Sequence, residues 1–295
     1  MSPPATSAVP ASTAHRMTAD ERRASLSLAG IFALRMLGLF LVLPVFALEA
    51  ARYPGGDDPA LVGLAMGIYG LTQAVMQVPL GLASDRIGRK KVIVAGLLVF
   101  ALGSVLAALA GSVHLLVAGR ALQGAGAVSA AVTALLADLT RDEVRTKAMA
   151  LVGVSIAAMF ALSLMAAPPL AGAVGLSGLF WLTALAVAGV VLVLAATPAE
   201  PVQHADVPRG RLQDVWRHPH LWRLDLGVFV LHTVQMAMWV VVPGLLVQAG
   251  LVKADHWKLY LPAVLASFVF MGGLFALGRR GHLRAVLRGG IALLL

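Results

Sequence analysis

The stretch that decides the fold lies between two uncharged runs and reads Gly81-Leu82-Ala83-Ser84-Asp85-Arg86-Ile87-Gly88-Arg89-Lys90-Lys91. Residues 61–83 and residues 92–113 contain no Asp, Glu, Lys or Arg. Each run is long enough to cross a bilayer, since about 20 helical residues span the roughly 30 Å of hydrocarbon. The sequence therefore predicts two membrane helices joined by a short charged turn on one membrane face.

The composition requires lipid around the chain. Of the 295 residues, 59% are hydrophobic and 13% charged, against about 25% charged in soluble domains. The net charge of +9 suggests nucleic acid, but the basic residues lie in short clusters between apolar runs, as topology signals do. The chain has no cysteine and no motif with metal-ligand or nucleophile spacing. We therefore expect no nucleic-acid partner, no metal, no cofactor and no enzymatic activity.

The apolar runs predict eight membrane spans. Residues 148–199 lack Asp, Glu, Lys and Arg altogether, which is too long for one span, so we expect two spans folded around Gly172–Gly178. The predicted fold class is an all-α polytopic membrane protein, with a six-helix N-terminal bundle and the first two helices of a second bundle. The expected spans are 26–48, 61–83, 92–113, 114–137, 148–170, 177–196, 226–247 and 259–277.

Composition also predicts the domain boundaries. The N-terminal residues are rich in Pro, Ala, Ser and Thr and lack the apolar core of a signal peptide, so they are expected to form a flexible tail. A polar, proline-containing stretch follows the sixth span and is expected to link the two bundles. The predicted parts are tail 1–25, bundle 26–197, linker 198–225, second-bundle start 226–288, and a shortened ninth helix 289–295.

Basic residues predict the orientation. Eighteen of the 23 lysines and arginines fall in the tail and in the loops after even-numbered spans. The loops of the opposite face contain only Arg52, Lys253 and Lys258. Because cytoplasmic loops are enriched in Lys and Arg, the N-terminus is expected in the cytoplasm. Two arginines remain, Arg35 and Arg120, and both lie within spans.

The pattern Gly-x-x-x-Asp-Arg-x-Gly-Arg-Lys-Lys resembles the signature loop between helices 2 and 3 of the major facilitator superfamily, at every fixed position. The resemblance implies a transporter of two six-helix halves, here shortened at the C-terminus. Segments 34–38 and 135–141 are similar to those of bacterial drug/proton antiporters. The antiporter motif expected at the end of helix 5 is only partly present, because Pro168-Pro169 and Gly172 retain one proline and one glycine of it.

The resemblance also implies a conformational latch at the cytoplasmic face. Asp85 would face the N-terminus of helix 11, where the helix dipole favours a carboxylate, and Arg89 would pair with Asp138 at the end of helix 4. Gly88 permits the tight turn. The alternative is that these charges are only topology markers. The predicted latch consists of Gly81, Asp85, Arg86, Gly88, Arg89, Lys90 and Asp138.

Two arginines within spans are candidates for a proton or substrate cavity, because a cation in a span is costly and normally faces a cavity or a partner. The stretch from Arg120 through Gln123 to Gly126 is similar to the family's helix 4 motif. The alternative for Arg120 and Arg35 is that each side chain extends to the membrane surface. Counting along the spans puts the two arginines at different depths, so we expect them in separate places.

Span 7 contains a candidate proton carrier. His232 lies near its middle, and histidine is the side chain whose charge changes near neutral pH. Asp225 lies two turns nearer the cytoplasm. The alternative is a neutral histidine bonded to a neighbouring helix.

Together these patterns predict a secondary active transporter in the bacterial inner membrane, performing proton-coupled efflux of a small molecule by alternating access. The expected partners are the lipid bilayer, a small-molecule substrate and protons. The alternative is an inactive membrane fragment or a non-transporting scaffold.

Overall fold

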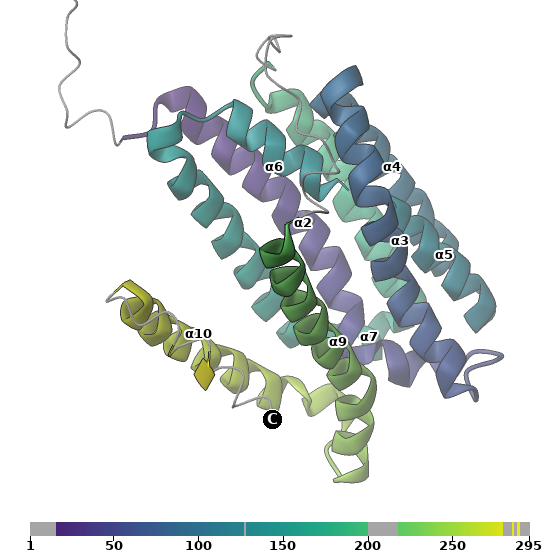
Figure 1. Cartoon of the computed structure of the whole chain (residues 1–295). Coiled ribbons are helices and arrows are strands. Elements are labelled where there is room, and N and C mark those ends of the chain that lie inside the picture. Colours follow the sequence, from purple (N-terminus) through teal and green to yellow (C-terminus); the bar gives the residue numbers. More distant parts are fainter. Residues whose placement is uncertain (1–15, 127, 200–217, 280–284, 286–287, 290–295) are drawn as a thin grey trace, which may run out of the picture.

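The computed structural model describes residues 16–126, 128–199, 218–279, 285 and 288–289, and it is helical there (Figure 1). Six stretches of these residues are long and apolar enough to cross a membrane. The elements are α2 (Ala19–Ala50), α3 (Pro59–Ile87), α4 (Arg89–Ala108), α5 (Val113–Ala125), α6 (Ser129–Asp138), α7 (Asp142–Ala196), α9 (Pro219–Gln248), the 3₁₀ turn η1 (Lys253–Asp255) and α10 (Trp257–Arg279).

The 55-residue element α7 contains two of the predicted spans. A straight helix of that length would extend about 80 Å, far beyond one bilayer. Gly175 interrupts it with a φ of 67° and a ψ of −176°, a conformation that glycine adopts without a steric penalty. Ala148 near its start and Val190 near its end belong to the same buried cluster. The two halves of α7 therefore form the hairpin that the sequence predicted around residues 172–178.

The predicted fourth span is formed by α5 and α6, with Gly126 as the C-cap of α5. A Cβ on Gly126 would lie 2.3 Å from the Gly96 carbonyl oxygen, and one on Gly124 would lie 2.2 Å from the Tyr69 carbonyl oxygen. The predicted span over 114–137 lies within Val113–Asp138, which is long and apolar enough to cross a membrane. Its glycines let it approach the backbones of α3 and α4 closely.

The first helix begins at Ala19, seven residues before the predicted span. Thr18 and Glu21 form a capping box, in which each side chain accepts a hydrogen bond from the other residue's backbone N–H. Glu21 also accepts from the Arg141 guanidinium, with 2.7 Å between Oε1 and Nε. The cap and this ion pair hold residues 19–25, which composition assigned to the tail, in helical structure against the start of α7.

Two buried clusters form the interior of the first bundle. One end of the bundle carries Asp85, Arg89 and Asp138, and we call it the Arg89 end. The opposite end carries Glu49 of the first bundle and Lys253 of the second, and we call it the Lys253 end.

Of the two buried clusters, one includes Leu28 and Leu135, and the other includes Val45 and Phe180. Large apolar side chains remain exposed on α3 and α9, for example Leu71, Val75, Val228 and Phe229, as expected for surfaces covered by lipid or by other helices.

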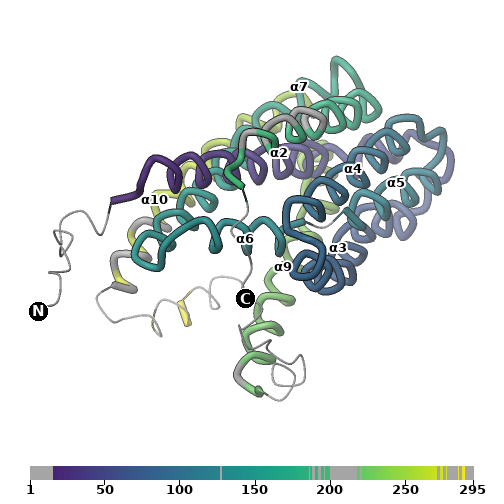
Figure 2. Tube along the Cα trace, turned by 90° about the horizontal axis from the view of Figure 1, so that it is seen from above, coloured from purple at the N-terminus to yellow at the C-terminus, as the bar shows by residue number. Residues whose placement is uncertain are grey.

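The second bundle begins with α9, which packs against α2, and continues with α10, which packs against α7 (Figures 1 and 2). Helix α9 starts at Pro219, inside the range 198–225 predicted as linker, and most of that range lies outside the described residues. Helix α10 covers the predicted eighth span. The predicted ninth helix, 289–295, lies outside the described part except for Gly289.

Candidate functional site

The signature loop is a single-residue turn between two helices. Gly88 ends α3 and precedes α4 with a φ of 103°, a value that side-chain-bearing residues rarely adopt. The turn places Arg89 in the first position of α4. Its Nη1 donates to Oδ1 of Asp85 at 2.7 Å, and its Nε donates to Oδ2 of Asp138. The pairing of Arg89 with the acid at the end of α6, expected from the resemblance, is therefore present.

The remaining loop residues differ in their surroundings. Lys90 donates from Nζ to the Thr197 carbonyl oxygen at 2.6 Å, which places a cation at the C-terminal end of α7, where the helix dipole favours it. Arg86 is exposed to the surroundings. A Cβ on Gly81 would meet Ala130 at 3.6 Å, an ordinary contact. Arg89 and Lys90 thus connect α3, α4, α6 and α7 at one end of the bundle.

Arg35 is buried in the interior, with 1% of its surface exposed. Its Nη1 donates to the Ser129 hydroxyl at 2.9 Å. Its Nη2 donates to the Tyr69 hydroxyl at 3.1 Å and to Oε1 of Gln73 at 2.7 Å. The guanidinium therefore joins α2 to α3 and α6, and the structure excludes the alternative that this side chain extends to the membrane surface.

Arg120 is 2% exposed and equally enclosed. Its Nη1 donates to Oε1 of Gln123 at 2.9 Å, and the Gln123 amide donates to the Ser104 hydroxyl at 2.7 Å. Its Cζ lies 4.6 Å from the centroid of the Tyr69 ring and 5.9 Å from that of Phe46. These cation–π contacts and hydrogen bonds hold the charge inside the bundle, so this side chain does not extend outward either.

Tyr69 brings the two arginines together. Its hydroxyl accepts from Arg35, and its ring lies against Arg120. Counting residues along the spans did not predict this shared contact with Tyr69, because such a count does not show which helices pack together. Sequence reasoning missed Tyr69, although its spacing of four from Gln73 puts both on one helix face. We call Arg35, Tyr69, Gln73, Arg120 and Gln123 the arginine cluster.

The arginine cluster is electrostatically unusual. Every described hydrogen-bond partner of its two guanidinium groups is neutral. The Nε atoms of Arg35 and Arg120 are buried without a hydrogen-bond partner in the described part of the chain. Since a buried cation needs a partner to offset its lost hydration, the cluster would favour an anionic group brought near it.

The candidate proton carrier of span 7 lies elsewhere. Both His232 and Asp225 are exposed on α9. The His232 Nδ1 lies 2.9 Å from the Val228 carbonyl oxygen of its own helix. The described contacts of the arginine cluster include neither residue, so the structure does not bring the predicted cavity residues into one site.

Within the described ranges, no group of three or more His, Cys, Asp or Glu is arranged to hold a metal ion. Sequence reasoning also missed the ion pair between Glu21 and Arg141. The capping-box spacing of Thr18 and Glu21 was the available signal for the helix start, but no local pattern indicates the distant arginine.

Comparison with known proteins identifies relatives. The sequence profile of the Major Facilitator Superfamily matches residues 28–295. The chain is 47% identical over 259 residues to the inner membrane transport protein YajR of Escherichia coli (strain K12), covering 86% of this chain and 57% of YajR. It is 31% identical over 147 residues to the tetracycline resistance protein, class B, of Escherichia coli, covering 49% of this chain and 36% of that protein.

Solved structures show the same fold. A bacterial homologue of the human lysosomal transporter Spinster, in an inward-facing and unoccupied conformation, has a TM-score of 0.68 at 18% identity, over 90% of this chain and 64% of that one. A D-xylose–proton symporter has a TM-score of 0.61 at 16% identity, over 87% and 69%. The chain spans 57% of the length of YajR. On the profile match and this helix arrangement, it belongs to the Major Facilitator Superfamily, a family of membrane transporters and not of enzymes.

Proposed function

We propose that the chain is a secondary active transporter that moves a small molecule by alternating access, with the Arg89 end in the cytoplasm. Its membership of a transporter family supports this proposal, as does the concentration of Lys and Arg in the loops of that end. The name of YajR supports a location in the bacterial inner membrane.

The more specific proposal is proton-coupled efflux. Support comes from the tetracycline resistance protein and from multidrug resistance protein 2 of Bacillus subtilis, which is 32% identical over 45% of this chain. Both matches involve less than half of the chain, so they bear on the mechanism of the shared helices and not on a particular substrate.

The observation that carries the proposal is the arginine cluster. Two buried cations meet at Tyr69 inside a helix bundle, and their described partners are neutral. Ionisable groups inside membrane helices normally belong to substrate or proton pathways, because their burial is otherwise costly. We assign the arginine cluster to the site where substrate binding and proton transfer influence one another.

The latch contributes a different part of the proposed mechanism. Arg89 contacts both Asp85 and Asp138, and Lys90 contacts the end of α7. Four helices of the first bundle are thereby tied together at one end, and such a unit can move as one body against the second bundle. His232 and Asp225 remain proposed proton-transfer groups on the second bundle.

A vesicle assay tests the proposed function. Inverted membrane vesicles containing the chain are given a pH gradient, and accumulation of a fluorescent lipophilic anionic dye is followed. We expect accumulation that collapses with the gradient and falls at least tenfold in Arg120→Gln. The matched control is Arg23→Gln, which removes an exposed arginine near the N-terminus and should leave accumulation unchanged.

Two results would favour the inactive fragment or scaffold instead. One is dye distribution that ignores the pH gradient, and the other is equal accumulation by Arg120→Gln and the unaltered chain. Expression and membrane insertion of each variant are checked by quantifying the chain in the vesicles.

A further inference from the structure

The Lys253 end contains an ion pair between the two bundles. Lys253, in the turn between α9 and α10, donates from Nζ to Oε1 of Glu49 at the end of α2. The Glu49 side chain is 5% exposed and that of Lys253 is 18% exposed. Arg52 lies at 3.5 Å from the second Glu49 oxygen, with 72% of its side chain exposed. Glu49 therefore holds the second bundle mainly through Lys253.

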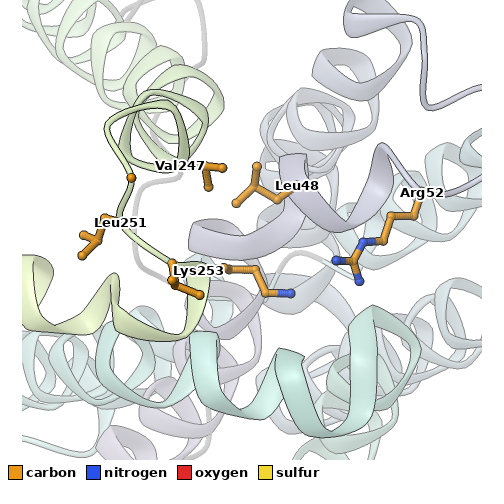
Figure 3. Close-up of a pocket in the computed structure, with 7 residues that line it drawn as sticks. Leu48, Arg52, Val247, Leu251 and Lys253 are labelled. Carbon is orange, nitrogen blue, oxygen red and sulfur yellow. The ribbon is translucent and has the colours of Figure 1, made fainter.

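The ion pair borders a small opening between the bundles. A cavity of about 390 Å³ is lined by Leu48 and Arg52 from the first bundle and by Val247, Leu251 and Lys253 from the second. Figure 3 shows the Lys253 side chain pointing toward Arg52. The bundles thus meet here along a partly apolar seam that the ion pair crosses.

A chain of aromatic rings continues this seam into the protein. Phe40 of α2 meets Phe160 of α7 at 4.8 Å between ring centroids. Phe160 meets Trp239 of α9 at 6.1 Å, and Trp239 meets Tyr260 of α10 at 5.6 Å. All three pairs have the edge-to-face geometry that aromatic rings favour. The contact between bundles at this end is therefore both ionic and aromatic.

His256 lies at the end of this aromatic chain, fully buried and 5.9 Å from the Tyr260 ring. Its Nε2 lies 3.2 Å from the Leu251 carbonyl oxygen. Because a carbonyl only accepts, Nε2 carries the hydrogen, and Nδ1 is the unprotonated nitrogen of a neutral ring. This Nδ1 is buried without a partner among the described residues.

The groups around His256 disfavour a positive charge on it. The pKa of His256 is lowered, mainly because the side chain is buried. The hydrogen bond to the Leu251 carbonyl raises the pKa, and the nearby Lys253 cation lowers it further. The exposed neighbours Asp255 and Lys258 pair with each other at 2.9 Å. The end of α2 contributes Glu49 and the turn after it contributes Arg52, and residues 148–196 of α7 contain no Asp, Glu, Lys or Arg.

We propose that Glu49, Lys253 and the aromatic chain form a gate that closes the outer end of the transporter, and that protonation of His256 opens it. A proton on Nδ1 would add a buried donor without an acceptor and a second cation beside Lys253. The inference rests on the proposed function, which makes the Lys253 end the outer one and gives the two bundles independent movement.

The direction of the pH effect follows from linkage. The closed arrangement holds His256 neutral, so it binds fewer protons than an open arrangement in which the ring meets water. The closed state is therefore favoured fully above the ordinary histidine pKa of about 6.5 and loses this advantage as pH falls below it. For each pKa unit by which closure lowers the pKa of His256, acidification can raise the ratio of open to closed protein by up to tenfold.

Spin-label distances test the gate. The chain has no cysteine, so the exposed residues Ala51 and Ala249 can each be replaced by Cys and labelled specifically. In liposomes we expect a single short distance between the labels at pH 8.0 and an added longer component at pH 5.5. Glu49→Gln should show the longer component at both pH values. His256→Gln, which stays neutral, should keep the short distance at pH 5.5.

Two further variants separate the ion pair from general charge effects. Exchange of the charges in Glu49→Lys with Lys253→Glu should restore the short distance at pH 8.0. Lys258→Gln removes an exposed lysine in the first turn of α10 and should retain the normal pH response. Identical distances at both pH values in the unaltered chain would overturn the proposal, as would opening of His256→Gln at pH 5.5.

The labels report geometry without any substrate, so the two proposals fail separately. A normal pH response without dye accumulation would overturn the proposed function and retain the acid-sensitive contact. Dye accumulation with distances that do not depend on pH would retain the function and overturn the gate.

Discussion

At the scale of single residues, Tyr69 links the two buried arginines. Its hydroxyl accepts a hydrogen bond from Arg35, while its ring lies under Arg120. The two contacts use different parts of one side chain, so substitutions can separate them. The burial of both guanidiniums makes the loss of either contact expensive, because water does not reach the freed donor.

We expect Tyr69→Phe to destabilise the protein by roughly 1–3 kcal/mol, because it removes an acceptor from a buried charged donor and preserves the ring beneath Arg120. Tyr69→Leu should cost more, because it also removes the cation–π contact. Thermal unfolding in detergent measures both. Tyr53→Phe is the control, since that tyrosine lies at the loop after α2. Equal stability of Tyr69→Phe and the unaltered chain would contradict the observed hydrogen bond.

At the scale of helices, glycine decides how closely the elements pack. A Cβ on Gly124 of α5 would lie 2.0 Å from the Thr72 hydroxyl oxygen and 2.2 Å from the Tyr69 carbonyl oxygen. A backbone atom at that distance cannot move without shifting α3. The same close approach positions Tyr69 between the two arginines, so packing and the arginine cluster depend on one another.

Gly124→Ala is expected to separate α5 from α3 and to lower stability by about 1–3 kcal/mol or more, as overpacking does. Gly67 lies in α3, and nothing lies within 4 Å of its Cβ position. Gly67→Ala should therefore be neutral or slightly stabilising. Thermal unfolding of the two variants is compared in one detergent. A Gly124→Ala protein as stable as Gly67→Ala would show that this contact is looser than the structure has it.

At the scale of the whole molecule, charge is distributed unequally between the two ends. The Arg89 end carries the signature loop with its four basic residues, and the Lys253 end carries Arg52, Lys253 and Lys258 in its loops. The proposed topology, with the Arg89 end in the cytoplasm, rests on this inequality, because Lys and Arg near a span are retained in the cytoplasm.

Labelling from one side of the membrane checks this topology. Ile87→Cys at the Arg89 end and Ala51→Cys at the Lys253 end both place a thiol at an exposed position. In right-side-out vesicles a membrane-impermeant maleimide should label Ala51→Cys and spare Ile87→Cys, and permeabilisation should expose both. Labelling of Ile87→Cys in sealed vesicles would reverse the proposed orientation, and with it the outer position of the gate.

The amino-acid sequence alone determined the helical membrane class and the hairpin around residues 172–178, and the resemblance of the signature loop led us to expect the pairing of Arg89 with Asp138. Hydropathy and glycine positions act over a few neighbouring residues, whereas that ion pair joins residues 49 apart. Only the tertiary structure decided that Arg35 and Arg120 share Tyr69 and that Glu49 meets Lys253. Those contacts depend on the tilt, rotation and spacing of helices far apart in the chain, which packing sets and no local pattern records.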